Sequence, residues 1–74
     1  GVGHAYVDVR GLLSRGSSPL EFAAWSGHLN VVKLLVQAAA RWNINLKMVP
    51  ALYYASENGH DHIVAYLLSL GVDV

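Results

Sequence analysis

The 74 residues can form one small domain at most, and 54% of them are hydrophobic while only 14% are charged. Because so short a domain buries only about 60% of its unfolded surface, we expect part of this apolar surface to contact neighbouring units. Five basic and five acidic residues give a formal net charge of zero, and the basic residues form no run, which excludes the basic stripe typical of nucleic-acid-binding proteins. The chain has no cysteine, which excludes disulfides and thiolate metal sites and favours an intracellular location, cytoplasmic or nuclear.

The first part of the chain carries little structural signal. Two glycines, Gly1 and Gly3, disfavour a helix at the N-terminus. We expect residues 1–9 to be the end of a preceding structural unit or residues added in cloning. Residues 11–17 are rich in glycine and serine, a composition that predicts a tight, hairpin-like loop.

Two short amphipathic helices are predicted next, on either side of a Gly-His turn. Ser18 can cap the first helix, Pro19 suits its first position, and Glu21 stands three residues after the cap, so a capping box predicts a helix over residues 19–26. Gly27 ends that helix as a left-handed glycine would. A broadly apolar second helix is predicted over residues 29–38, with an extension through residues 38–40 favoured by three successive alanines.

The same landmarks recur 32 residues later. Gly27-His28 returns as Gly59-His60, and the apolar pattern of the first two helices returns with it. This recurrence predicts two structural units, residues 10–42 and residues 43–74. In the second unit the helices are expected near residues 50–58 and 61–70. This second unit lacks a turn glycine in its loop and a side chain able to cap its first helix.

The stretch SPLEFAA, followed by SGH and VVKLL, resembles the ankyrin repeat, whose signature contains T-P-L-H-x-A at a period of about 33 residues. Ser18 stands in place of the threonine and Glu21 in place of the histidine. The resemblance implies an all-α fold, an ankyrin-type solenoid of stacked antiparallel helix pairs joined by hairpin-like loops. It also implies about two repeats of a longer array, so we expect the natural protein to continue beyond this sequence.

The resemblance further implies a protein-protein interaction module that binds through loop tips and the exposed side of the first helix of each unit. Carried over by position, the partner-binding residues are Ser14, Arg15, Ser17, Trp25, Ser26, Lys47, Met48, Glu57 and Asn58. Trp25 with Arg15 is the expected anchor, because tryptophan and arginine are enriched at binding hot spots. Trp25 could equally cover a neighbouring repeat, whereas Trp42 and Tyr53 are interpreted as structural.

No catalytic arrangement is visible, so no enzymatic activity and no cofactor are expected. The cluster His60-Asp61-His62 is a poor metal site, because residues two apart on a helix point in different directions. Ser18-Pro19 could be a phosphorylation site, but helix initiation explains both residues. No apolar run approaches the ~20 residues of a membrane span. The alternative to a binding module is a structural spacer within a larger multidomain protein, in contact only with adjacent repeats of its own chain.

Overall fold

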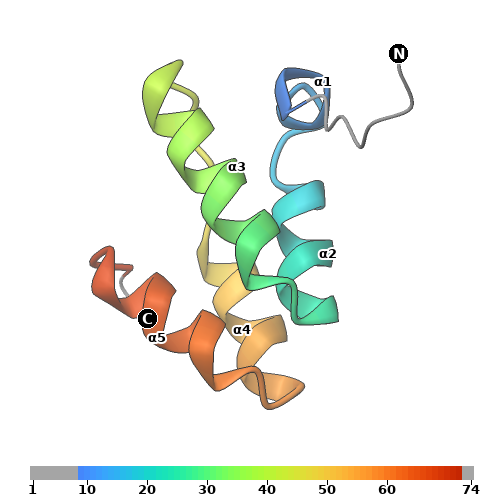
Figure 1. The fold of residues 1–74 in the computed structure, drawn as a ribbon, viewed down its shortest axis with the longest axis vertical. Coiled ribbons are helices and arrows are strands. Elements are labelled where there is room, and N and C mark those ends of the chain that lie inside the picture. The colour runs from blue at the N-terminus through green and yellow to red at the C-terminus, as the bar shows by residue number, and fades with distance from the viewer. Residues whose placement is uncertain (1–8, 73–74) are drawn as a thin grey trace.

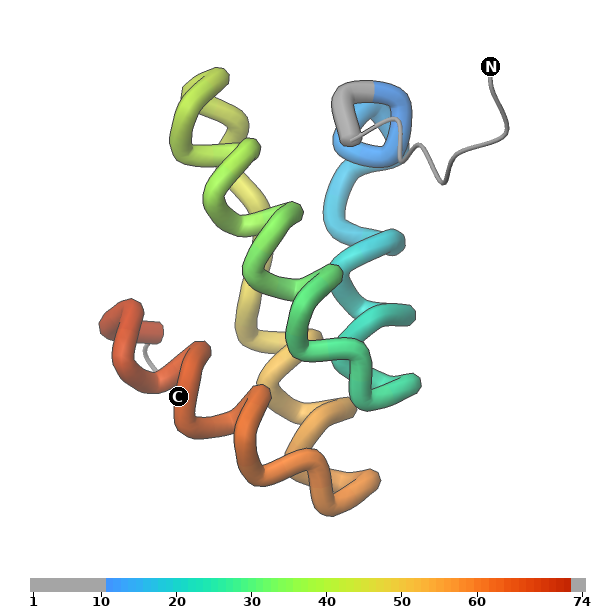
Figure 2. Tube along the Cα trace, in the orientation of Figure 1, coloured from blue at the N-terminus to red at the C-terminus, as the bar shows by residue number. Residues whose placement is uncertain are grey.

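The computed structural model describes residues 9–72, with side chains from residue 11 onward, and its regular structure in that range is entirely helical. The helices are α1 (Val9–Leu13), α2 (Ser18–Ser26), α3 (Leu29–Arg41), α4 (Val49–Glu57) and α5 (Asp61–Ser69). Helices α2 and α3 form one antiparallel pair, α4 and α5 form a second, and α2 lies beside α4 (Figure 1). The chain path in Figure 2 shows α2 and α4 running in the same direction. The all-α fold of stacked antiparallel helix pairs is therefore confirmed.

The segment predicted as a hairpin-like loop is in part a helix. Helix α1 includes Gly11, and only residues 14–17 form the turn. Leu13 explains the difference, because its side chain is buried in the core and Leu12 packs beside it. Burying these two leucines against α3 outweighs the turn preference of the surrounding glycines and serines. The loop prediction for residues 11–13 was wrong.

The start of α2 also differs from the sequence prediction. Ser18 is the first helical residue, not the cap, and the capping residue Ser17 makes no side-chain hydrogen bond to its own helix. Its Oγ instead accepts a hydrogen bond from the backbone N–H of Lys47, at 2.8 Å. The predicted capping box is therefore absent, while the proline in the first turn is confirmed. Ser17 ties the start of one helix pair to the loop that leads into the next.

The two Gly-His turns have the same geometry. Gly27 and Gly59 both adopt the left-handed conformation, with φ values of +84° and +72°, which favours glycine. The backbone N–H of His28 donates to the carbonyl of Ala23 at 2.9 Å, and that of His60 donates to Ala55 at 2.8 Å. These bonds satisfy carbonyls that the helix end would leave without partners.

Helix α3 continues through residues 38–40 to Arg41, so the predicted extension of this helix is confirmed. The missing turn glycine is replaced by Asn43, which has a φ of +56°; asparagine tolerates this conformation better than other side chains. The N–H of Ile44 then donates to the carbonyl of Ala39 at 2.8 Å. Helix α4 starts after Met48 without a side-chain cap, as expected.

The core lies between the two pairs. Alanines at the crossing of α2 and α4 allow the two helices to approach closely, and Ala24, Ala51 and Ala55 are completely buried there. Larger side chains from α3 and α5 fill the remaining space. The buried hydrophobic residues are Leu13, Leu20, Ala23, Ala24, Val32, Leu35, Val36, Ala39, Leu46, Ala51, Leu52, Ala55, Ile63 and Leu67. Leu46 belongs to the loop before α4, so this apolar loop is held against the core.

Candidate functional site

The outer side of α2 and α4 carries exposed aromatic side chains. Phe22 is 65% exposed, Trp25 is 52% exposed and Tyr53 is 60% exposed. The rings of Phe22 and Trp25 are stacked, with centroids 6.2 Å apart and planes at 27°. Tyr53 and Tyr54 meet edge to face at 5.9 Å and 68°. We call Phe22, Trp25, Tyr53 and Tyr54 the aromatic surface. Exposed aromatic side chains gathered in this way are typical of interaction surfaces.

A hydrogen bond from the aromatic surface reaches the end of α4. The Tyr53 hydroxyl donates to Oε2 of Glu57 at 3.1 Å. This hydrogen bond, together with the negative charge of Glu57, raises the pKa of Tyr53 above its usual value of 10.0. The neutral tyrosine thus donates its hydroxyl proton to the Glu57 carboxylate one helical turn further along α4.

Trp25 is held in place through its backbone. Nε2 of His60 lies 3.0 Å from the Trp25 carbonyl oxygen, in the geometry of a hydrogen bond from the imidazole. The same ring lies against Gly27, where it occupies the space that a Cβ atom would need. His60 was interpreted as the turn histidine of the repeat, and it links the second Gly-His turn to the first.

The predicted loop residues fall into two groups. Ser14 and Arg15 are exposed in the turn before α2. Ser17 and Lys47 meet through the hydrogen bond described above, and Met48 is half-buried and packs on the core. The structure therefore brings the two loops together at Ser17 and Lys47.

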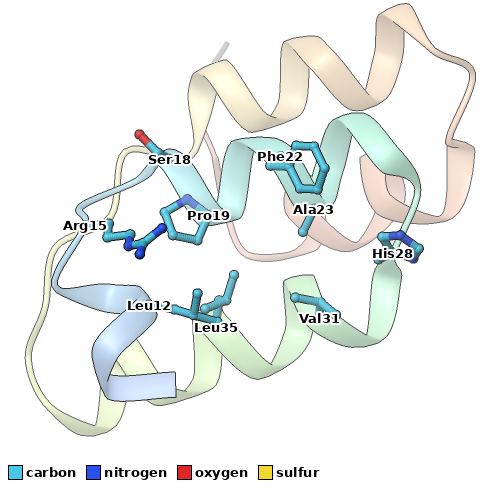
Figure 3. Close-up of a pocket in the computed structure, with 9 residues that line it drawn as sticks. All are labelled: Leu12, Arg15, Ser18, Pro19, Phe22, Ala23, His28, Val31 and Leu35. Atoms are coloured by element: carbon cyan, nitrogen blue, oxygen red, sulfur yellow. The ribbon is translucent and has the colours of Figure 1, made fainter. Parts of the chain in front are cut away.

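Arg15 and Trp25 do not share a hollow. Arg15 lies beside Pro19 at an apolar hollow of about 450 Å³ on the outer side of the first helix pair. Figure 3 shows Leu12, Val31 and Leu35 on one side of this hollow and Pro19, Phe22 and Ala23 on the other. Trp25 lines a different hollow, on the side of α4, and Phe22 alone of the aromatic residues lines both.

Three predicted residues lie at the C-terminal ends of α2 and α4. Ser26 is half-buried at the end of α2, and Glu57 and Asn58 are exposed at the end of α4. Asn58 donates from Nδ2 to the carbonyl of Tyr54 at 3.0 Å. This hydrogen bond occupies the Asn58 amide with its own helix, whereas Glu57 extends the aromatic surface with a carboxylate.

Sequence reasoning missed two members of the aromatic surface. Phe22 stands three positions before Trp25, a spacing that places both on one helix face. Tyr54 follows Phe22 at the repeat spacing of 32 residues. These two spacings were the available signal. Tyr53, which was interpreted as structural, is 60% exposed and lines an apolar hollow of the second helix pair. Trp42 is 38% exposed and follows the last residue of α3.

Two further expectations concern metals and membranes. Within residues 9–72 no group of three histidine or acidic side chains is arranged to hold a metal ion. His60 faces Gly27 and Trp25, while His62 is exposed on α5. None of the described helices has the length and apolar character needed to span a membrane.

Known proteins share this sequence pattern. The family described as ankyrin repeats in three copies matches residues 3–74. The chain is 43% identical over 53 residues to a protein of Oryza sativa subsp. japonica named as a probable E3 ubiquitin-protein ligase, XBOS33. The matched region covers 70% of this chain and 10% of that protein. It is 41% identical over 61 residues to ankyrin repeat and SAM domain-containing protein 6 of Mus musculus, covering 80% of this chain and 7% of that protein. It is 45% identical over 56 residues to alpha-latrotoxin-Lh1a of Latrodectus hasselti, covering 76% of this chain and 4% of that protein.

The chain thus spans a tenth or less of the length of each of these curated relatives. No solved structure matches it with comparable significance.

Proposed function

The chain belongs to the ankyrin repeat family, whose repeats are in general protein-interaction modules, and we propose that it binds a partner protein through its loop tips and the aromatic surface of α2 and α4. The supporting observation is that Phe22, Trp25 and Tyr53 are each more than half exposed, although neighbouring positions of the same helices are fully buried. Large aromatic side chains contribute more binding free energy than other residues when a partner covers them. Exposing three of them on adjacent helices is otherwise unfavourable.

We also propose that this segment has no catalytic role of its own. Proteins named as a probable ubiquitin-protein ligase and as a latrotoxin share the segment. A segment that accompanies such different names is better suited to recognition than to one shared reaction.

The test is selection from a phage-displayed peptide library on the immobilised chain, followed by affinity measurement on purified peptides. Trp25→Ala and Arg15→Ala should each weaken selected peptides at least several-fold, with helicity unchanged by circular dichroism. Leu34→Ala is the matched control, because Leu34 is an exposed apolar residue on α3. If both test variants bind as the wild type does, the proposed surface is wrong.

One observation favours the spacer alternative. The second pair has an apolar hollow of about 330 Å³, lined by Leu52, Val64 and Leu68 among others. In the first pair the equivalent of Leu68 is Val36, which is buried, whereas Leu68 is 47% exposed. A further repeat stacked on α4 and α5 would cover Leu68 in the same way. A library that yields no binder, together with a melting temperature raised by fusing a consensus repeat after residue 74, would favour the spacer role.

A further inference from the structure

A second hollow lies within the aromatic surface, between α2 and α4. It has a volume of about 260 Å³ and is lined by Ser18, Glu21, Phe22, Trp25 and Tyr54. Three of the five lining residues are aromatic, and one is a carboxylate. Lysine, arginine and histidine are absent from the described residues that line it.

We propose that this hollow binds the side chain of an arginine from the partner polypeptide, an inference that rests on the proposed function and names the chemistry of its ligand. A guanidinium is attracted to the electron-rich faces of aromatic rings. Its planar shape suits stacking on an aromatic ring such as Trp25, and its N–H groups form charge-assisted hydrogen bonds with a carboxylate such as that of Glu21, which lines the same hollow.

The charge at the hollow selects against an uncharged apolar side chain. Glu21 is half-buried and makes no ion pair within the described part of the chain. An apolar ligand would remove water from this carboxylate without replacing its hydrogen bonds, which is unfavourable. A guanidinium replaces those hydrogen bonds and adds an opposite charge. Glu57, at the end of α4, adds a second negative charge to the same surface.

A cation already lies over an aromatic ring elsewhere in the molecule. Nζ of Lys33 on α3 lies 5.6 Å from the centroid of the Tyr66 ring on α5. That contact joins the second helices of the two pairs, on elements other than those that form the hollow. Lys33 therefore supplies a cation to the Tyr66 ring from within the chain. The only charged side chain among the described residues that line the hollow is the carboxylate of Glu21.

The walls of the hollow are held in position before any ligand arrives. Phe22 stacks on Trp25, and the Trp25 backbone is bound by His60 of the second pair. The Tyr54 ring is supported by the edge contact with Tyr53. The ring contacts restrict these side chains in the free protein, which lowers the ordering cost of binding.

The test compares two short peptides that differ only in charge. The probes are acetyl-Gly-Gly-Arg-Gly-Gly-amide and the same peptide with citrulline, which has the shape of arginine without its charge. A Trp42→Phe background leaves Trp25 as the sole tryptophan, so its fluorescence and indole N–H resonance report the hollow. Titration to about 20 mM covers the millimolar affinity expected for a single side chain.

The arginine peptide should shift both Trp25 signals and bind roughly fivefold more tightly than the citrulline peptide. Glu21→Gln should weaken the arginine peptide by a similar factor. Asp61→Asn is the matched control, because it removes one negative charge from an exposed position on α5 and should leave binding unchanged. Equal binding of the two peptides, equal loss in Glu21→Gln and Asp61→Asn, or no binding at all would overturn the inference.

The outcomes separate this inference from the proposed function. Library peptides that depend on Trp25 but contain no arginine would support the interaction module and refute the arginine site. Arginine-peptide binding that depends on Glu21, without any library binder dependent on Trp25, would support the site and refute the module.

Discussion

The contact between Gly27 and His60 makes a strong prediction about stability. A Cβ atom at position 27 would lie 2.6 Å from Cε1 and 2.8 Å from Nδ1 of His60, closer than real Cβ atoms approach. Gly27→Ala must therefore displace the imidazole, and with it the hydrogen bond to the Trp25 carbonyl. The substitution should loosen the junction between the two helix pairs.

The expected magnitude has two parts. Alanine in the left-handed conformation costs about 1–2 kcal/mol, and Gly27 has a φ of +84°. The lost hydrogen bond adds about 0.5–1.5 kcal/mol, which gives a destabilisation of about 1.5–3.5 kcal/mol in total. Gly59 is the matched control, since it has a similar φ of +72° but a Cβ atom added there would meet nothing within 4 Å. Gly59→Ala should therefore cost only the conformational part.

Equilibrium urea denaturation followed by circular dichroism measures both free energies of unfolding, with sucrose added to keep the weaker variants folded at the start. Gly27→Ala should lose about 1 kcal/mol more than Gly59→Ala. In a His60→Ala background the two substitutions should cost the same, because the obstructing ring is gone. Equal losses in the wild-type background would refute the steric argument, and a difference that persists without His60 would assign it to another cause.

Three further outcomes follow from the structure. Ser17→Ala should lower the free energy of unfolding by about 1 kcal/mol, because it removes the acceptor for the Lys47 N–H. Ser18→Ala should change the free energy of unfolding by less than about 0.5 kcal/mol. Urea denaturation measures both losses, and a larger loss in Ser18→Ala than in Ser17→Ala would support the capping box. Glu57→Gln should lower the pKa of Tyr53 toward 10.0, as followed by tyrosinate absorbance with Tyr53→Phe as the reference; the stability that comes from the raised pKa is present below pH 10.0 and is lost as the pH rises through the folded-state value. Two repeats without polar caps should melt below about 50 °C, so a cooperative, reversible, monomeric transition well above that temperature by calorimetry would contradict the expected marginal stability.

The repeat register was predictable because its landmarks are local. Gly27 and Gly59 end helices in a conformation that disfavours other residues, and the spacing between them sets the position of the second unit. Each predicted end of the helices in the second unit lies within one residue of the observed end. Composition near a turn was less reliable, because burial of Leu13 decided the structure of α1. Asn43 was overlooked since its left-handed conformation is one that glycine more often adopts.

The candidate site was only partly predictable, because its hollow forms between helices that are distant in the sequence. Trp25 was identified from its own helix, but its partner Tyr54 comes from α4 and lies near it only because small alanines let α2 and α4 approach. A sequence examined one helix at a time gives no measure of that approach. The missing information is therefore the packing distance between repeats, which the alanines set.

The outer positions of the two first helices pair aromatic with acidic side chains in an alternating way. Three pairs of positions are equivalent at the spacing of 32 residues: Glu21 and Tyr53, Phe22 and Tyr54, and Trp25 and Glu57. At two of these three pairs one helix carries an acid where the other carries an aromatic residue, and the third pair is aromatic in both. At the hollow between the two helices, the Glu21 carboxylate lies among the side chains of Phe22, Trp25 and Tyr54, so a cationic ligand that contacts α2 and α4 there gains both attractions. Specificity for arginine would then belong to the pair of repeats, because neither helix alone carries the full set.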